Sequence, residues 1–269
     1  MLTANFRDTV ANHSAGISSL LLSLAIFLCL SLPCPLSPAP CLYGEQRDRL
    51  VFTQLHYGSK WDPYPETWQD ILEFLTTTTS IRSEQKRRVL TLQDPLLFSS
   101  PLLFILGTDE FPQLLPKERD ILRRYLSNGG FLFVEDSSGL KGSRFDTSFR
   151  REIALVFPEL RLKQLPQHHP LYRAYYLLRK VGGRRLTSNS FEGIDIAGKT
   201  ALIYSQNDLI GAWAKDRFGN YLWECVPGGQ DQRFEAQKLT LNLIMYSVTG
   251  TYKSDAIHQS YLQQKLINR

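Results

Sequence analysis

The pattern that decides the fold lies in residues 101–139, which read PLLFILGTDEFPQLLPKERDILRRYLSNGGFLFVEDSSG. Two apolar runs, Leu102–Leu106 and Phe131–Val134, have the length and composition of buried strands. Each run ends in an acidic loop, and a helical pattern at Pro116–Leu126 lies between them. A strand, a helix and a second strand in this order predict two parallel strands joined by a right-handed crossover.

The ends of the central helix carry clear signals. Pro116 suits the first turn, where its missing N–H costs nothing. Glu118 lies near the positive end of the helix dipole and Arg124 near the negative end. Gly129 supplies the left-handed residue that stops the helix. The run that follows, Phe131–Val134, is apolar at every position, which predicts a central strand covered by helices on both faces.

The same alternation extends in both directions along the chain. We expect strands at Leu50–Leu55, Arg88–Leu92, Thr200–Ser205 and Asn220–Cys225, helices from Pro65 and over Phe145–Leu155 and Phe234–Val248, and a loop at Pro158–Pro170. These elements predict an α/β domain of three layers over residues 45–250, in which a mostly parallel sheet has helices on both faces. A polar tail covers 251–269.

The charge of the 269-residue chain is modest and dispersed. Its formal net charge is +5 and its pI is about 9.0, but the cations come as separate pairs, such as Arg123-Arg124 and Arg184-Arg185. We interpret them as solvated side chains on separate faces; weak attraction to nucleic acid or to an anionic surface is the other interpretation. We therefore predict no nucleic-acid partner.

The N-terminal region predicts export. Residues 17–32 are almost wholly apolar, a run of about 16 residues that suits the core of a signal peptide better than a membrane span of about 20. The proline-rich stretch Ser31–Cys41 follows and breaks any helix. We predict a signal peptide, cleaved near 39–44, or an uncleaved membrane anchor over residues 1–44, with the body periplasmic or held at the membrane. A buried core helix is the remaining interpretation.

Cysteine usage leaves one question open. Cys29 and Cys34 lie in or beside the export segment, which leaves Cys41 and Cys225 for the mature body. Export would permit a disulfide between these two residues, and the sequence does not decide whether they pair.

Polar side chains gather at the predicted carboxyl ends of the parallel strands, where open α/β sheets bind their ligands. From these segments, and from the turn after the first strand, we select as ligand-binding candidates His56, Tyr57, Trp61, Asp109, Glu135, Ser137, Asn207 and Asp208. Neighbouring carboxylates can divide acid and base roles between them, or bind a divalent cation through oxygen. The same residue types also form turns and cap helices, which is the alternative for each of them. We predict no specific metal site and no cofactor.

A second candidate is His169, in the sequence His168-His169-Pro170. Adjacent histidines point apart, so they do not chelate one metal, but one of them can act as a general base. The alternative is a loop histidine that is hydrogen-bonded to the backbone. The chain lacks a P-loop and the His-Glu-x-x-His, Cys-x-x-Cys and Gly-x-Ser-x-Gly motifs, which removes the enzyme classes that these motifs define.

A series of short motifs resembles the DUF4159 family of bacterial proteins over about residues 49–250. The motifs are Trp61-Asp62-Pro63, Asp94-Pro95, Gly107, YLSNGGFL at 125–132 with Glu135-Asp136, Phe157-Pro158-Glu159, His169-Pro170-Leu171-Tyr172, Gly193-Ile194-Asp195 and Ser205-Gln206-Asn207-Asp208-Leu209. The resemblance implies a flavodoxin-like domain, similar to the class I glutamine amidotransferase-like and ThuA-like domains. It also implies a membrane-associated setting with MoxR-type ATPases and von Willebrand factor A proteins as partners.

One departure from the amidotransferases bears on activity. Their nucleophilic cysteine follows the strand that corresponds to Phe131–Val134, where this chain has Glu135-Asp136-Ser137-Ser138. Cys225 lies on a different predicted strand, so the resemblance implies no thiolate chemistry. A serine would need a nearby base, for which His169 is the candidate. Asp136 lies at about the position of the nucleophile.

We therefore expect an exported or membrane-anchored domain that acts as a non-enzymatic ligand-binding or interaction module in a bacterial cell-envelope assembly. The alternative is a hydrolase for a small polar or carbohydrate-like substrate that uses Asp136 and His169, together with Asp109 or Asp208. The two hypotheses differ in geometry, because catalytic acids and bases must act within hydrogen-bond reach or through one water.

Overall fold

The computed structural model describes residues 49–249. The predicted signal peptide or anchor, Cys41 and the polar tail at 251–269 lie outside these residues. Cys225 is buried, and the question whether it pairs with Cys41 falls outside the described residues. None of the helices within residues 49–249 combines the length and the apolar character that a membrane crossing requires.

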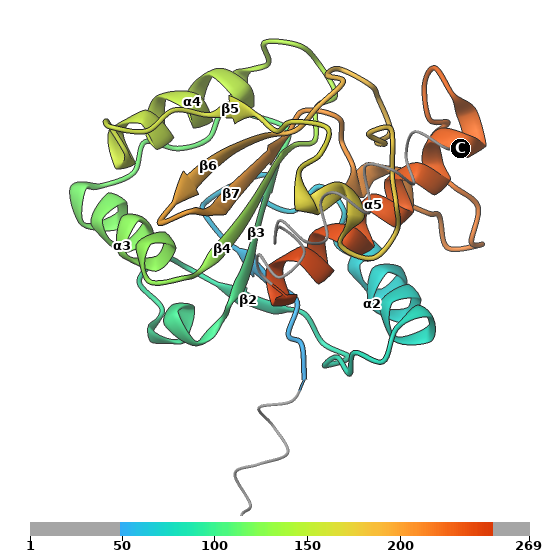
Figure 1. The fold of residues 1–269 in the computed structure, drawn as a ribbon, viewed down its shortest axis with the longest axis horizontal. Helices are drawn as coiled ribbons and strands as arrows, with labels where there is room; N and C mark the ends of the chain where they lie inside the picture. The colour runs from blue at the N-terminus through green and yellow to red at the C-terminus, as the bar shows by residue number, and fades with distance from the viewer. Residues whose placement is uncertain (1–48, 250–269) are drawn as a thin grey trace, which may run out of the picture. The chain divides into compact units, whose positions relative to one another are not determined.

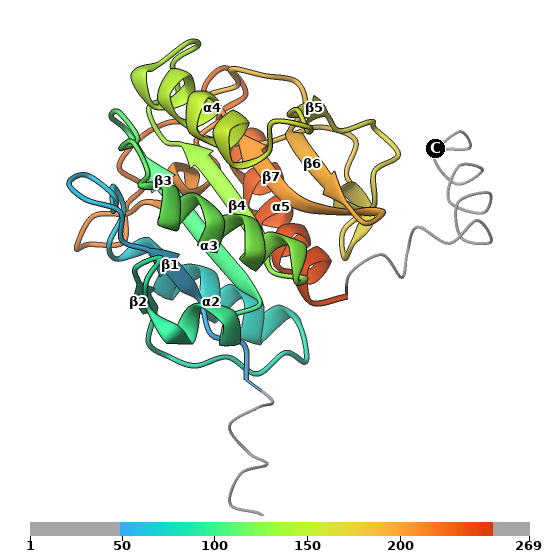
Figure 2. The ribbon, with the colours of Figure 1, turned by 90° about the vertical axis from the view of Figure 1, so that its left-hand side faces the viewer.

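A seven-stranded sheet forms the middle layer of residues 49–249 (Figures 1 and 2). Its strands, in spatial order, are β2 (Arg88–Leu90), β1 (Thr53–Leu55), β3 (Leu102–Gly107), β4 (Phe131–Asp136), β7 (Lys199–Ser205), β6 (Glu192–Ile196) and β5 (Lys163–Gln164). The first five are parallel, and β6 and β5 add antiparallel pairs at one edge. Counted along the chain, the parallel strands have the order 2-1-3-4-5, which is the order of flavodoxin. The predicted fold class is confirmed.

Helices cover both faces of the sheet (Figure 1). One face carries α2 (Thr67–Thr78) and α5 (Gly229–Thr249), and the other carries α3 (Pro116–Ser127) and α4 (Arg144–Val156). The alternation of side chains along β4 explains why both faces are apolar. Phe131 and Phe133 pack in the core under α2 and α5, whereas Leu132 and Val134 pack in the core under α3 and α4.

Short 3-10 helices connect several of these elements, namely η1 (Pro95–Ser99), η2 (Pro170–Arg173) and η3 (Ile210–Trp213). The predicted strand–helix–strand unit at residues 101–139 is confirmed. Its helix ends as predicted, because Gly129 follows it with a left-handed φ of 95°.

Glu135 and Asp136 lie in a strand rather than in the predicted loop. They continue the ladder of β4, in which Asp136 pairs with Gly107 of β3 and Glu135 pairs with Ser205 of β7. Both residues are fully buried. The register aligns the ends of β3, β4 and β7 at one edge of the sheet, which we call the carboxyl edge.

The predicted strand at Asn220–Cys225 is wrong. The segment belongs to a loop in which the carboxylate of Asp216 accepts hydrogen bonds from the N–H groups of Phe218, at 2.8 Å, and Asn220, at 2.9 Å. That turn leaves only a single-residue bridge between residues 215 and 221. The sheet instead uses β6, which the sequence does not predict, and the two-residue strand β5 inside the predicted loop at Pro158–Pro170.

Candidate functional site

The two acidic residues that end β4 point to opposite faces of the sheet, because successive side chains of a strand alternate. Glu135 shares the face of Phe133, which α2 and α5 cover. Asp136 shares the face of Val134, which α3 and α4 cover. The two carboxylates therefore lie in separate environments.

Glu135 stabilises the start of η3. One carboxylate oxygen accepts a hydrogen bond from the N–H of Leu209, and the other accepts one from the N–H of Ile210 at 2.9 Å. Groups of this kind have no partner within the helix that they begin. Burial, together with the nearby charge of Asp208, raises the pKa of Glu135 well above its ordinary value.

Asp208 lies in the turn between β7 and η3 and is fully buried. Its backbone has a left-handed φ of 54°, which aspartate tolerates better than most residues. The carboxylate oxygens lie 2.9 and 2.8 Å from Tyr64 Oη, and they accept hydrogen bonds from Arg184 Nε and, at 3.2 Å, from the N–H of Gly211. Burial raises the pKa of Asp208 to about 6, and Arg184 opposes that rise.

Glu135, Asp208, Tyr64 and Arg184 form what we call the acid cluster, in which the guanidinium of Arg184 pairs with Asp208 and the charge of Asp208 acts on Glu135. The Arg184 side chain is 16% exposed. Its guanidinium lies 5.2 Å from the ring centre of Trp223, and the Trp223 ring also contacts the Tyr64 ring edge-on at 5.8 Å. Trp223 therefore covers part of the acid cluster.

Ser137 adjoins the acid cluster. Its carbonyl oxygen lies 3.4 Å from Tyr64 Oη. The side chain is buried, and its Oγ has no hydrogen-bond partner among residues 49–249. A buried hydroxyl of this kind is unusual, so Ser137 keeps hydrogen-bonding capacity that its own chain does not use.

Asp136 holds the start of α4. Its carboxylate accepts hydrogen bonds from Ser143 Oγ at 2.6 Å and from the N–H of Ser138 at 3.0 Å. Ser143 Oγ in turn accepts from the N–H of Asp146 at 2.9 Å and caps the helix. Burial raises the pKa of Asp136. The residue at the expected nucleophile position therefore supports a helix cap.

Asp109, at the end of β3, is the more accessible carboxylate, with a side chain that is 24% exposed. It forms ion pairs with Lys60 at 2.7 Å and with Arg144 at 2.8 Å. The hydrogen bond from Lys60 lowers the pKa of Asp109. Asp109 therefore joins the loop after β1 to the start of α4.

Tyr57 lies at the position where a sheet with this strand order usually binds its ligand. That place is the crevice between β1 and β3, where the strand order reverses. Tyr57 Oη donates a hydrogen bond to the carbonyl of Leu106 at 2.7 Å, and it would lie 2.2 Å from a Cβ atom at Gly107. Burial raises the pKa of Tyr57. The ring therefore fills the crevice at the strand ends.

The remaining edge candidates pack against their own loops. His56 is exposed, and its ring lies 5.0 Å from that of Trp61, which the Arg87 guanidinium covers at 5.4 Å. Asn207 is fully buried, and its Oδ1 accepts hydrogen bonds from the backbone N–H groups of residues 187 and 188 at 2.9 and 2.8 Å. Asn207 thus fastens the 187–188 segment to the end of β7.

His169 caps η2. The N–H of Leu171 donates to Nδ1 at 3.1 Å, so the ring hydrogen is assigned to Nε2, which lies 3.0 Å from Thr200 Oγ1. Thr200 Oγ1 donates in turn to Asp195. Burial lowers the pKa of His169 to about 4. The ring is therefore neutral near pH 7 and has both nitrogens engaged.

The structure does not bring His169 and Asp136 together. His169 contacts Thr200 at the amino end of β7. Leu132 of β4 pairs with Leu202 of β7, so in this register Thr200 lies beside residue 130. Asp136 lies six residues further along β4, which corresponds to about 20 Å of strand. The acid–base pair that the hydrolase alternative requires is therefore not assembled.

Three residues at the acid cluster lack a sequence signal, namely Tyr64, Arg184 and Trp223. The pair Arg184-Arg185 reads as solvated, yet Arg184 binds Asp208 through its side chain and also donates from its N–H to the Asp208 carbonyl at 2.8 Å. Only the folded chain brings residues 184 and 208 together. Within residues 49–249, three or more acidic, histidine or cysteine side chains nowhere converge as a metal site would need.

The fold and the carboxyl edge define an α/β domain with a mostly parallel sheet, whose acidic edge residues are largely bound by their own chain. The model of the family DUF4159, a domain of unknown function, matches residues 51–248. The chain therefore belongs to this family, as its motifs predict. A search of curated proteins finds no match to the chain.

Proposed function

We propose that this domain is a non-enzymatic ligand-binding or interaction module of a bacterial cell-envelope assembly. The observation that carries the proposal is how the acidic residues of the carboxyl edge are used. Glu135, Asp136 and Asp208 are each 0% exposed, and each binds N–H or O–H groups of its own chain. A catalytic carboxylate must reach its substrate directly or through one water, and these three are enclosed by protein.

His169 supports the same proposal. A general base needs a nitrogen that can take a proton from the substrate near the working pH. Nδ1 of His169 already accepts a hydrogen bond, and burial holds its pKa at about 4. Its contacts suit a residue that joins η2 to β7.

The location and the partners are proposed on other grounds. The apolar run at 17–32 suits a signal peptide or a membrane anchor, which favours export to the periplasm or attachment to the membrane. The proposed partners, a MoxR-type ATPase or a von Willebrand factor A protein, rest on the family resemblance. A small polar ligand is the other candidate for the binding function.

A pull-down from the native cell envelope tests the proposal. The full chain carries its tag at the C-terminus, because cleavage of a signal peptide would remove an N-terminal tag. An unrelated exported protein with the same tag serves as the control. We expect mass spectrometry to identify an ATPase or an adhesion-type partner in every replicate. Repeated recovery of the protein alone would count against the interaction function.

A further inference from the structure

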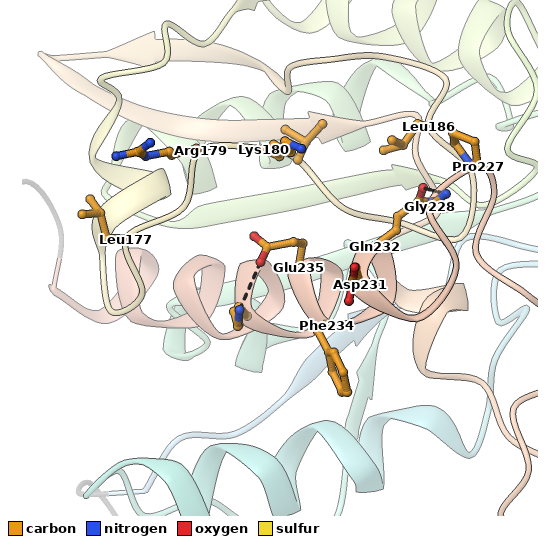
Figure 3. Close-up of a pocket in the computed structure, with 12 residues that line it drawn as sticks. Leu177, Arg179, Lys180, Leu186, Pro227, Gly228, Asp231, Gln232, Phe234 and Glu235 are labelled. Carbon is orange, nitrogen blue, oxygen red and sulfur yellow. Dashed lines mark hydrogen bonds and ion pairs between the residues drawn. The ribbon is translucent and has the colours of Figure 1, made fainter. Parts of the chain in front are cut away.

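A groove lies between the segment 177–186 and α5 (Figure 3). Its volume is about 910 Å³, and its lining includes Leu177, Lys180, Val181, Leu186, Asp231 and Glu235. This volume falls within the range of about 300–1,000 Å³ that is usual for ligand sites. None of the predicted carboxyl-edge residues lines it, so it is a separate site within the described part of the chain.

The two walls of the groove differ in charge. The loop wall carries Arg179 and Lys180, and the helix wall carries Asp231, Glu235 and Lys238 (Figure 3). Glu235 forms an ion pair with Lys238 at 3.0 Å, whereas Lys180 and Asp231 form no ion pair with other residues of 49–249. Leu186 adds apolar surface and is 38% exposed. Within the described part of the chain, the groove therefore offers an unpaired cation, an unpaired carboxylate and an apolar surface.

The loop wall also presents backbone groups that have no hydrogen-bond partner among residues 49–249. The N–H and C=O groups of Lys180, Val181 and Gly182 make no hydrogen bond to any residue that the structure describes. On either side of them, the N–H groups of Leu178 and Arg184 are bonded, each at 2.8 Å. Backbone polar groups of buried residues are paired in the great majority of cases, and Val181 is buried. Unpaired backbone groups in a row are a template for another extended chain.

The loop wall is fixed against α5. Gly182 approaches the helix so closely that a Cβ atom would lie 2.2 Å from the backbone nitrogen of Ala236. Gln232 Nε2 also donates hydrogen bonds to the carbonyls of Gly183, at 2.7 Å, and Val226, at 3.0 Å. A wall that is already ordered lowers the entropy cost of binding a partner.

We propose that this groove binds an extended peptide segment of a protein partner. The segment pairs its backbone with Lys180 and Val181, places an apolar side chain against Leu186, and directs a basic side chain to Asp231 and an acidic one to Lys180. A peptide supplies both signs of charge and backbone hydrogen-bonding groups at once, whereas nucleic acid and anionic lipid present negative charge to Asp231. This inference rests on the proposed interaction function and identifies its surface.

Selection from a phage-displayed library of random decapeptides on the full chain tests the proposal. We expect enrichment of peptides in which apolar residues separate one acidic and one basic residue. Synthetic copies should bind the Leu186→Ser and Asp231→Lys variants at least tenfold more weakly than the unchanged protein. Leu155→Ser, on α4 at 48% exposure, is the matched control and should bind normally. Melting temperatures confirm that each variant is folded.

Two measurements separate backbone pairing from apolar contact alone. N-methylation of alternate peptide residues removes the donors that face one side of an extended chain, and it should weaken binding at least tenfold in one of the two registers. Amide hydrogen exchange at Lys180 and Val181 should slow when the peptide is bound. Unchanged exchange at these amides would overturn the backbone pairing.

The outcomes also separate this inference from the proposed function. If no peptide is enriched, or if enriched peptides bind Leu186→Ser as tightly as the unchanged protein, the groove is not the peptide site. Recovery of the native partner by Leu186→Ser at the normal level would overturn the groove and leave the interaction function intact. Self-association that Leu186→Ser abolishes would identify a second copy of the chain as the occupant and overturn the peptide proposal.

Discussion

Replacement of Arg184 by methionine tests the energetics of the acid cluster. Methionine keeps much of the apolar stem and removes the guanidinium that binds Asp208. Asp208 is 0% exposed, and its other partners, Tyr64 and the N–H of Gly211, are neutral. Removal of one partner of a buried ion pair costs about 3–5 kcal/mol. We expect Arg184→Met to lower the free energy of unfolding by about 2–4 kcal/mol at pH 7.5, because partial exposure of Arg184 already screens the ion pair.

The loss should depend on pH. Without the guanidinium, the folded pKa of Asp208, which burial already raises to about 6, rises further. A carboxyl group whose pKa is higher in the folded than in the unfolded protein stabilises the fold while it is protonated. This stability is fully present below the unfolded pKa of 3.8 and is lost as the pH rises through the folded pKa. The Arg184→Met loss should therefore be small near pH 5, where Asp208 keeps its proton, and largest above pH 7.

The assay is urea unfolding at pH 5 and pH 7.5, followed by far-ultraviolet circular dichroism. The series contains the unchanged protein, Arg184→Met, Asp208→Asn and the double variant, and asparagine suits the left-handed φ at position 208. We expect a coupling energy of about 1–3 kcal/mol between the two changes at pH 7.5. A loss below about 0.5 kcal/mol for Arg184→Met, or additive losses in the double variant, would show that the ion pair between Arg184 and Asp208 does not stabilise the fold.

Three further predictions concern other parts of the sheet edges. Burial lowers the pKa of His169 from 6.5 to about 4, so stability that is present above pH 6.5 should be lost as the pH falls toward 4, by at most about 3 kcal/mol. His169→Asn keeps an acceptor for the N–H of residue 171 and should lack this loss in urea unfolding at pH 7 and pH 4.5; an unchanged pH dependence would contradict the assignment. Gly107→Ala places a Cβ atom 2.2 Å from Tyr57 Oη and should lower the unfolding free energy by about 1–3 kcal/mol. Thermal unfolding measures it, and an unchanged melting temperature would show that the crevice has spare room. Ser143→Ala removes the cap of α4 and a partner of Asp136, which should cost about 1–3 kcal/mol and speed amide exchange in the first turn of α4. Unchanged exchange there would rule out the capping role.

The central part of the fold can be predicted from the sequence because its signals are local. The apolar runs of β3 and β4 and the stop at Gly129 lie within one short stretch, and each element depends mainly on its own residues. The prediction fails where pairing with neighbouring strands determines the secondary structure. Glu135 and Asp136 are polar enough to suggest a loop, but pairing with β3 and β7 extends the strand through them.

The candidate site shows the same division. Residue types at the strand ends predict which side chains lie at the carboxyl edge, as they do for Asp109 and Asp208. Composition does not predict that Arg184 binds Asp208, because a backbone contact between distant segments aligns them. Nor does it show that Tyr57 fills the crevice, which depends on the space above Gly107. These features depend on tertiary packing, which a linear pattern does not encode.

We propose that the buried carboxylates stabilise the fold while binding occurs elsewhere on the domain. The most direct measurement determines the melting temperature and the recovery of the envelope partner on one preparation of Asp208→Asn. We predict a melting temperature lower by about 4–8 °C, from a loss of about 2 kcal/mol in a domain of this size, with partner recovery equal to that of the unchanged protein. An unchanged melting temperature together with loss of the partner would contradict the claim.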